Sequence, residues 1–379
     1  MYTKLSSTQI TVCVVEISGK GGICHYTYNL CNNLGEKIVT KLVSSTHYEL
    51  VGYNKKFLYY GIFNRFKTSP FKLIKIFRYF KKNKPAIIHF QLSQYPSLIL
   101  ILMLLCKFFL KTKVIITAHN VISHEEKFYN KWIFSNIYRI ADKIIVHAFA
   151  NKGEMINLFS LSHKKIEVIP HGNYMFFNQL NKNVEIASCC EIDNSIPVIL
   201  FFGYIRKYKG LMYLIQSMPQ IIKLYPKAKL IIAGNPVEPF DEYQKEINKL
   251  NLSSNIIVDL QYIPFEKVRF YFQKSTVVVL PYLKVYQSGI LQLAYGFSKP
   301  VVVTNTGGLI EAVKEGETGY IVPPKDVSAM AAAIIKIISD MELAKKMGVK
   351  AQSFAEKEFS WESVAEKTIT VYRKSLLGK

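Results

Sequence analysis

Short apolar runs rich in valine and isoleucine alternate with longer, helix-like segments along the first half of the chain. The runs occupy residues 10–17, 86–90, 113–120, 143–148 and 166–170. Runs that are apolar at nearly every position predict strands covered on both faces, as in a parallel sheet. Because helix-like segments separate these strands, the pattern predicts βαβ units and a doubly wound α/β domain.

The same pattern restarts after the polar stretch 178–195. Its apolar runs are 197–203, 228–234, 255–260, 276–281 and 300–305. A chain of 379 residues is long enough for two ordinary α/β domains. We therefore predict two Rossmann-like, doubly wound parallel-sheet domains facing a cleft, over residues 1–178 and 179–360. The last segment, 361–379, is predicted to be a helix that can pack on either domain, including back on the N-terminal one.

Charge is unevenly distributed along the chain. The net charge is +22, and residues 1–178 hold 24 Lys and Arg against 8 Asp and Glu, whereas the remainder holds 25 against 19. A basic half attracts polyanions such as nucleic acid, anionic lipid or phosphorylated substrates, although a solvated lysine-rich surface is the plainer interpretation. No zinc finger, helix-turn-helix or basic–aromatic stacking motif supports nucleic-acid binding.

Cysteine usage and hydropathy indicate a protein of the reducing cytosol. The six cysteines include no CxxC pair, so we expect buried or incidental thiols. The first residues lack the long apolar core of a signal peptide. The apolar stretch 97–110 is interrupted by Lys107 and is shorter than the roughly 18–20 residues of a bilayer span. We expect a buried helix there, and a cytoplasmic protein that is soluble or peripheral to a membrane.

Two polar motifs follow predicted strands of the first domain. A glycine loop at 18–30 contains Gly19, Gly21 and Gly22, and a helix starting near Ile23 would direct its amides and positive dipole end at an anion. The spacing fits neither the dinucleotide fingerprint nor a Walker A loop, so a structural turn and a phosphate-facing loop both remain open. His119 ends another strand, where an imidazole can face a ligand, although a lone histidine is more often structural.

The second domain begins with a basic loop, FFGYIRKYKGL at 201–211. A predicted strand ends at Gly203, and Arg206, Lys207 and Lys209 follow before the next helix. Guanidinium and ammonium groups at a strand end suit a diphosphate, because arginine can bind two oxygens and lysine acts as a point charge. The alternative is an ordinary basic loop.

A fourth motif extends over residues 280–326. Ser288 and Gly289 precede a helix whose N-terminal amides could hold phosphate. Gly307 and Gly308 mark another turn from strand to helix. Two further glycines, Gly316 and Gly319, are predicted to be turn residues without a ligand role.

Taken in order, these motifs resemble the retaining glycosyltransferase family 4, which has GT-B architecture. The resemblance covers nearly the whole chain and is strongest over 197–326, where Lys209–Gly210 and the run from Lys299 to Pro323 match the family pattern. By resemblance, Lys209 looks like the lysine that neutralises the donor diphosphate, and His119 is similar to the histidine that contacts the donor sugar. The donor-binding positions implied are Gly21, Gly22, Gly203, Tyr262, Ile263, Gln287, Ser288, Gly289, Gln292, Gly307, Gly308 and Glu311.

The sequence departs from this family at three positions. Tyr204 stands where many members carry arginine, and Arg206 could supply that charge. Val285 and Leu293 stand where many members carry two glutamates, and neither side chain can bind a sugar or ribose hydroxyl. The neighbouring polar residues that could substitute are Gln287, Ser288, Gly289 and Gln292.

The resemblance implies a metal-independent hexosyltransferase without a cofactor, whose donor is a UDP or GDP type of nucleotide sugar. Lys209, Arg206 and the amides near Ser288 would stabilise the charge on the departing diphosphate. The acceptor would be a saccharide or a lipid-linked saccharide bound by the basic N-terminal domain. Alternatives are a catalytically silent partner subunit and a basic polyanion-binding protein.

Residues 65–84 have the periodicity of an amphipathic helix. Apolar side chains near one face are Phe71, Leu73, Ile74, Phe77 and Phe80, and the surrounding cations are Lys72, Lys75, Arg78, Lys81 and Lys82. This pattern is typical of a helix on an anionic membrane, at the inner face of the cell membrane. It is equally typical of a helix packed on its own domain.

Overall fold

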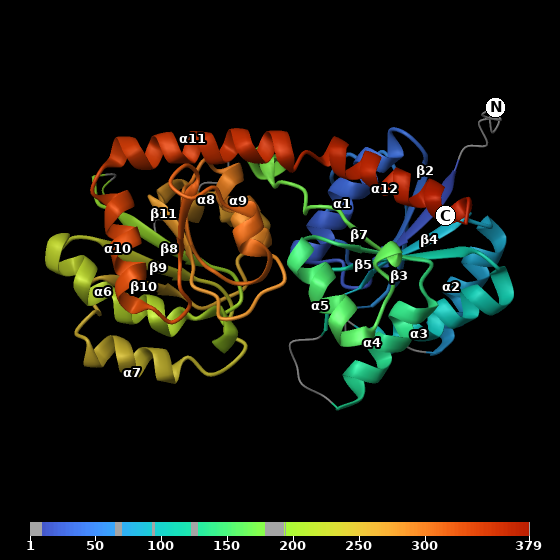
Figure 1. Cartoon of the computed structure of the whole chain (residues 1–379), viewed down its shortest axis with the longest axis horizontal. Coiled ribbons are helices and arrows are strands. Elements are labelled where there is room, and N and C mark those ends of the chain that lie inside the picture. The colour runs from blue at the N-terminus through green and yellow to red at the C-terminus, as the bar shows by residue number, and fades with distance from the viewer. Residues whose placement is uncertain are drawn as a thin grey trace. The chain divides into compact units, whose positions relative to one another are not determined.

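The computed structural model describes residues 10–64, 70–92, 95–122, 128–178, 193 and 195–378. The chain divides into two compact units (Figure 1). The N-terminal unit runs to Gly172 and includes Trp361–Lys379, and the C-terminal unit is Asn173–Ser360. Residues 173–178, which we assigned to the first domain, therefore belong to the second unit. Most of the polar stretch 178–195 lies outside the described residues.

The N-terminal unit contains a seven-stranded parallel sheet in the order β3-β2-β1-β4-β5-β6-β7. Its strands are β1 (Thr11–Val15), β2 (Val39–Ser45), β3 (Leu58–Phe63), β4 (Ile87–Leu92), β5 (Lys113–Ala118), β6 (Lys143–Val146) and β7 (Ile166–Val168). The five predicted strands are present, and β2 and β3 are additional. The central strand β4 is buried at every residue, as its apolar run predicts.

Helices cover this sheet and include one from the far end of the chain. They are α1 (Gly22–Gly35), α2 (Pro70–Asn83), α3 (Pro96–Leu105), α4 (Phe128–Ile140), α5 (Phe149–Phe159) and α12 (Trp361–Leu376). A π-helical segment, η1 (Cys106–Leu110), extends α3, and a short 3₁₀ turn covers His163–Lys165. α12 lies beside α1, and its Tyr372 hydroxyl is 2.7 Å from Nδ1 of His89 in the core (Figure 1). The terminal helix thus belongs to the N-terminal unit.

The C-terminal unit contains a six-stranded parallel sheet in the order β10-β9-β8-β11-β12-β13. Its strands are β8 (Val198–Phe202), β9 (Lys229–Ala233), β10 (Ile256–Asp259), β11 (Val277–Leu280), β12 (Val301–Thr304) and β13 (Gly319–Val322). The expectation that Gly319 is a turn residue is wrong, since it begins β13. Any side chain there would meet the carbonyl oxygen of Val301 at 2.2 Å, so glycine allows the two strands to pair.

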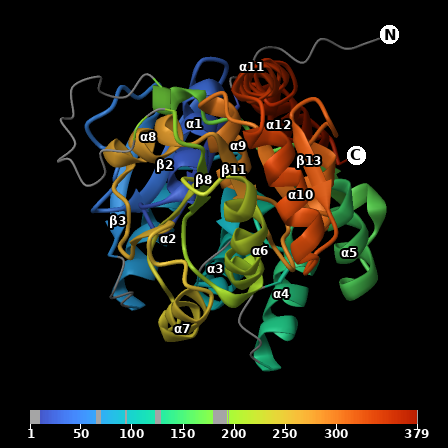
Figure 2. The ribbon, with the colours of Figure 1, turned by 90° about the vertical axis from the view of Figure 1, so that its left-hand side faces the viewer.

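The helices of the C-terminal unit are α6 (Leu211–Leu224), α7 (Asp241–Lys249), α8 (Phe265–Lys274), α9 (Gly289–Gly296), α10 (Val327–Ile338) and α11 (Met341–Glu358). Three 3₁₀ turns cover Met175–Asn178, Lys207–Lys209 and Gly307–Ala312. α6 and α10 pack against each other (Figures 1 and 2) and share one apolar core with α7 and the sheet. None of the described helices is both long and apolar enough to cross a membrane.

Each sheet has one point where the direction of strand addition reverses. In the N-terminal unit this switch lies between β1 and β4, and in the C-terminal unit it lies between β8 and β11. In such sheets the helices that follow the two strands leave on opposite faces, which opens a crevice at the carboxyl ends. The loops after β8 and β11 are those that carry the predicted basic loop and Ser288–Gly289.

Candidate functional site

Lys209 lies at the switch point of the C-terminal sheet. Its Nζ is 3.3 Å from the position that a β-carbon on Gly203 would occupy, directly after β8. Ile290, in the first turn of α9, meets the same position at 3.4 Å. Gly203 has a φ of 96°, a conformation that favours glycine, so this close approach depends on the missing side chain. The structure therefore brings together Gly203, Lys209 and the start of α9.

The ammonium group of Lys209 is buried, with no counter-ion in the described part of the chain. The residue is 9 % exposed, and no described residue forms an ion pair or hydrogen bond with its Nζ. The ring of Tyr282 lies below it, with the centroid 5.5 Å away. Burial, together with the nearby guanidinium of Arg206, lowers the pKa of Lys209 to about 8. An unpaired buried cation is costly, and an incoming anion would remove that cost.

The three cations of the basic loop separate into two groups. Lys207 is exposed, its backbone amide donates to Glu238, and its Nζ is 3.6 Å from a carboxylate oxygen of Glu242. Arg206 is half-buried, close to Lys209, and has no ion pair with a described residue. Arg206 and Lys209 can therefore bind an anion together, while Lys207 is held by acidic side chains of its own unit.

The loop after β11 is fixed against this basic loop. The amide of Leu283 donates to the carbonyl of Tyr208 at 2.7 Å, and any side chain on Gly210 would meet the carbonyl oxygen of Pro281 at 1.9 Å. Ser288 caps α9 with extended backbone and no side-chain hydrogen bond to the helix amides. The first amides of a helix are donors without intrahelical partners, so the start of α9 suits an anion beside Lys209.

Gln287 and Gln292 flank this helix start. Gln287 is half-buried. Gln292 is 3 % exposed, and its Oε1 has no hydrogen-bond donor among the described residues. A buried acceptor of this kind requires an explanation, and the hydroxyl of a ligand would satisfy it. By contrast, Val285 and Leu293 are buried among apolar residues, as their side chains dictate.

The remaining donor-binding candidates lie at the same edge of the sheet. Gly307 and Gly308 follow β12, and any side chain on Gly307 would meet the carbonyl oxygen of Val285 at 1.7 Å, which joins this turn to the loop after β11. Glu311 is exposed on the same turn. Tyr262 and Ile263 follow β10, the outermost strand on the other side of β8.

In the N-terminal unit, two glutamates organise the glycine loop. The carboxylate of buried Glu16 accepts from the amides of Ser18 and Gly19 at 2.8 and 2.9 Å, and from the hydroxyl of Ser44 at 2.8 Å. The amide of Gly21 donates to Glu49 at 2.8 Å. A phosphate at Gly21 would have to displace that carboxylate. Gly22 begins α1.

His119 is part of a chain of buried imidazoles. Its Nε2 is 2.9 Å from the amide oxygen of Gln91, and its Nδ1 is 3.3 Å from Nε2 of His147. His147 Nδ1 lies 3.0 Å from the carbonyl of Ile169 and must donate to it. His147 Nε2 then accepts from His119, whose own Nε2 must accept as well. If that nitrogen accepts, its donor must be the amide nitrogen of Gln91, which is otherwise buried without a partner among the described residues.

Both His119 and His147 are neutral. Burial lowers the pKa of His147 to about 4 and holds the pKa of His119 well below its usual range. Both ring nitrogens of His119 are engaged within the N-terminal unit. Its role as a sugar contact, implied by resemblance, stays a prediction.

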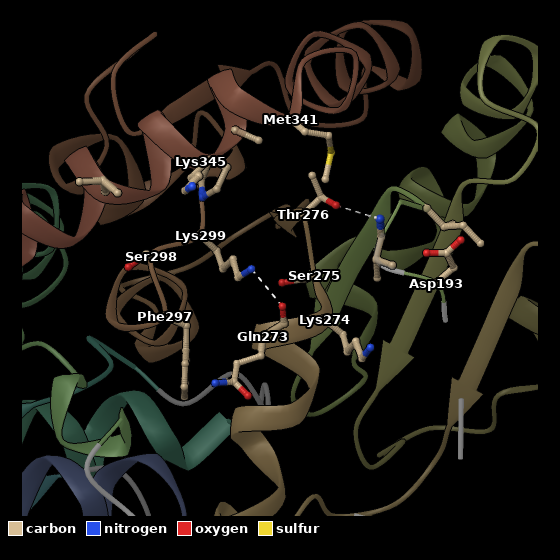
Figure 3. A pocket seen from close by; sticks show the side chains of 15 residues that line it. Asp193, Gln273, Lys274, Ser275, Thr276, Phe297, Ser298, Lys299, Met341 and Lys345 are labelled. Carbon is tan, nitrogen blue, oxygen red and sulfur yellow. Dashed lines mark hydrogen bonds between the residues drawn. The ribbon is translucent and has the colours of Figure 1, made fainter. Parts of the chain in front are cut away.

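A cavity of about 490 Å³ in the C-terminal unit lies at the opposite edge of the sheet, at the start of β8, β11 and β12 (Figure 3). The residues that line it include none of the predicted site residues. Lys299 donates from Nζ to the carbonyl of Gln273 at 3.1 Å, at the carboxyl end of α8. A cation there neutralises the negative end of the helix, which explains this lysine without a ligand.

Comparison with known proteins places both units in one family. Residues 190–354 match the model of glycosyl transferases group 1, and residues 20–172 match the model of glycosyltransferase family 4. The chain belongs to the family 4 glycosyltransferases of GT-B architecture. The resemblance inferred from the sequence motifs is thereby confirmed, as is the predicted fold class.

This glycosyltransferase has distant relatives in archaea and bacteria. It is 27% identical over 237 residues to an uncharacterized glycosyltransferase of Methanocaldococcus jannaschii, covering 61% of this chain and 60% of the relative. It is 27% identical over 256 residues to the capsular polysaccharide biosynthesis glycosyltransferase CapM of Staphylococcus aureus, covering 67% of this chain and 61% of the relative. The chain thus spans about three fifths of the length of these relatives.

A solved structure shows the same fold. The crystal structure of HepE from Anabaena in complex with UDP-glucose superposes on the glycosyltransferase with a TM-score of 0.76 and 16% sequence identity, over 96% of this chain and all of HepE. At that identity the likeness concerns the fold.

Sequence reasoning missed several residues of these sites. Glu16 stands out in retrospect as an acidic residue at the end of an otherwise apolar strand, directly before the glycine loop. Glu49 and Tyr282 gave no comparable signal, because only the fold brings them to Gly21 and Lys209.

Lys209→Met should stabilise the ligand-free protein at pH 7. The folded pKa of about 8 lies below the ordinary value of 10.5, so burying the charged lysine costs up to about 3 kcal/mol below pH 8. The cost shrinks between pH 8 and 10.5 and vanishes above. Urea denaturation at pH 7 measures the gain, with exposed Lys207→Met as a control that changes stability by less than about 0.5 kcal/mol. A destabilised Lys209→Met variant would show that burying the charge of Lys209 does not carry this cost.

Mild acid should destabilise the N-terminal unit selectively. All eight histidines precede residue 172, and burial lowers the pKa of His89 and His171 to about 3 and of His147 to about 4. The unfolded chain therefore binds protons more strongly below pH 6.5, and each of these histidines removes up to about 2 kcal/mol by pH 5. Hydrogen exchange at pH 7 and 5, corrected for intrinsic rates, should show lost protection in peptides of the N-terminal unit. Equal losses in both units would contradict this.

Proposed function

We propose that the protein transfers a hexose from a nucleotide diphosphate sugar of the UDP or GDP type to a hydroxyl of a saccharide or lipid-linked saccharide, with retention at the anomeric carbon. The observation that carries the proposal is the buried ammonium of Lys209, which has no counter-ion among the described residues and lies beside Arg206 and the start of α9. A diphosphate is an anion of suitable charge for two cations and a helix N-terminus.

The difficult step is departure of the nucleoside diphosphate. When the bond between the anomeric carbon and the diphosphate oxygen breaks, the electron pair stays on that oxygen and negative charge grows there. Lys209 and Arg206 are fixed in place before the reaction, so they would stabilise this charge without reorganisation. Gln292 Oε1, the buried acceptor without a hydrogen-bond donor among the described residues, would bind a hydroxyl of the nucleotide sugar. It would thereby take the role of the two glutamates that many family members carry where this chain has Val285 and Leu293.

We propose that these protein cations act without a metal ion or cofactor. Among the described residues, no group of three or more His, Cys, Asp and Glu side chains could hold a metal. The proposal therefore assigns to Lys209 and Arg206 the neutralisation that a divalent cation supplies in other sites.

The comparisons support this class of donor and acceptor. HepE has been crystallised with UDP-glucose, and CapM carries the name of a capsular polysaccharide glycosyltransferase. By analogy, we place the protein in the synthesis of a surface polysaccharide or glycolipid. We assign acceptor binding to the basic N-terminal unit and the working location to the cytoplasmic face of the cell membrane.

A ligand screen followed by one substitution tests the proposal. UDP, GDP, ADP and their common sugar conjugates are tested with EDTA present, and one base should raise the melting temperature. With that donor, Lys209→Met should lower turnover by about 100- to 1,000-fold, as when one donor to a developing oxyanion is removed. Release of the nucleoside diphosphate measures turnover. Lys207→Met is the matched control, because its ammonium already faces Glu242.

The outcomes separate the alternatives. Unchanged turnover in Lys209→Met would remove the proposed role of this lysine. Nucleotide binding without any turnover would indicate a silent partner subunit, consistent with the apolar Val285 and Leu293. No response to any nucleotide would overturn the proposal and favour a polyanion-binding protein.

A further inference from the structure

Two consecutive phenylalanines project from the N-terminal unit into solvent. Phe108 is 74% exposed and Phe109 is 70% exposed, in the π-helical segment η1. The sequence predicted a buried helix over 97–110, and that is correct for its first part, where Leu102, Met103 and Cys106 are fully buried. It is wrong for the last turn. Exposed neighbouring aromatics of this size usually mark a binding surface.

The side chain of Phe109 packs against α2. The ring of Phe109 meets the ring of Phe77 edge to face, with the centroids 5.9 Å apart. On the same helix Ile74 is 49% exposed, whereas Ile76 and Phe80 are fully buried in the unit. The helix predicted to lie on a membrane therefore uses part of its apolar face for its own core. Residues 65–69 of that prediction lie outside the described chain, and the apolar surface is completed by η1 instead.

The exposed face of α2, beside this apolar surface, is basic. Residues 50–124 contain 13 Lys and Arg and no Asp or Glu. The exposed cations of α2 are Lys75, Arg78, Lys81 and Lys82, at the spacing of a single helix face, and none forms an ion pair with a described carboxylate. Other cations of residues 50–124 do have acidic partners: Lys107 and Lys113 pair with Asp142, and Lys56 pairs with Glu36.

We propose that this surface, formed by Ile74, Phe108 and Phe109 with the exposed cations of α2, docks the protein on an anionic lipid bilayer. Phe108 and Phe109 insert at the level of the headgroups, and the lysines bind the anionic lipids. Either contribution alone gives weak binding, and the two together give stable association. A second copy of the chain is a poorer occupant, because its identical cations would face these. The inference rests on the proposed function and extends it, because a lipid-linked acceptor would lie at the surface of the membrane.

Vesicle sedimentation tests the inference, using phosphatidylcholine with about one third phosphatidylglycerol against pure phosphatidylcholine. The protein should bind the anionic vesicles, and both Phe108→Ser/Phe109→Ser and Lys75→Glu/Lys82→Glu should weaken binding at least tenfold. Lys346→Glu/Lys350→Glu on exposed positions of α11 changes the net charge equally, and Leu224→Ser/Val349→Ser removes equally exposed apolar groups. Both controls should bind within about twofold of the original protein.

The nucleotide-induced rise in melting temperature distinguishes this inference from the proposed function. It should persist in every variant, since none of the substituted residues belongs to the proposed donor site, and its persistence shows that the variants are folded. Undiminished vesicle binding in both docking variants would overturn the inference. So would a dimer in light scattering that only Phe108→Ser/Phe109→Ser dissociates, because the phenylalanines would then join two copies of the chain.

Discussion

The ammonium group of Lys209 is held out of water at the end of β8, with a tyrosine ring, a glycine and a second cation as its neighbours. A charge in that position disfavours the folded state unless an anion arrives. The local backbone is nevertheless built around it, because Gly203 leaves room for Nζ and Gly210 allows the loop to turn against Pro281. The C-terminal unit thus carries an electrostatic cost that a bound anion would remove, as expected of a binding site at which stability is exchanged for function.

The topology of the parallel sheet determines where the buried charge of Lys209 lies. Strand addition proceeds from β8 through β9 to β10, and then resumes on the other side of β8 with β11. The loops that leave β8 and β11 consequently meet, and the hydrogen bond from Leu283 to Tyr208 joins them. A basic loop and a helix N-terminus, distant in sequence by about 80 residues, are thereby brought together, and this is the arrangement that we propose binds an anion. The N-terminal unit uses the same topology differently, because glutamates rather than cations hold its glycine loop.

The sequence alone was sufficient for the fold class and for naming the two loops that the structure brings together at the candidate site. Ten strands were predictable because continuous apolar runs identify strands buried on both faces. β3 and β13 were missed since both are partly exposed edge strands that contain a glycine, and β2 has a lysine and two serines among its seven residues. Motif order was enough to locate the basic loop. It could not show that Lys207 pairs with Glu242 while Lys209 has no carboxylate partner in the described part of the chain, because that difference arises from contacts between distant segments.

The same limit applies to the surface of the N-terminal unit. Periodicity identified α2 as amphipathic but could not decide which apolar residues the unit would bury. The structure buries Ile76 and Phe80, leaves Ile74 exposed, and places the ring of Phe77 against Phe109. The segment that begins at Cys106 is π-helical, and this changes the angular positions of the side chains that follow. An apolar run predicted to be buried throughout therefore ends with Phe108 and Phe109 exposed to solvent. Such a change has no signature in apolar periodicity.

The most direct test of the central claim measures protons rather than turnover. If Lys209 has a pKa of about 8 without ligand and binds the diphosphate as a cation, binding at pH 9 must be accompanied by uptake of nearly one proton. Calorimetric titration of the bound nucleoside diphosphate in buffers of different ionisation enthalpy reports this number. The predicted result for the original protein is uptake close to one proton at pH 9 and close to zero at pH 7. In Lys209→Met, any residual binding at pH 9 should take up no proton. Binding without proton uptake at pH 9 would show that the charge of Lys209 does not hold the ligand.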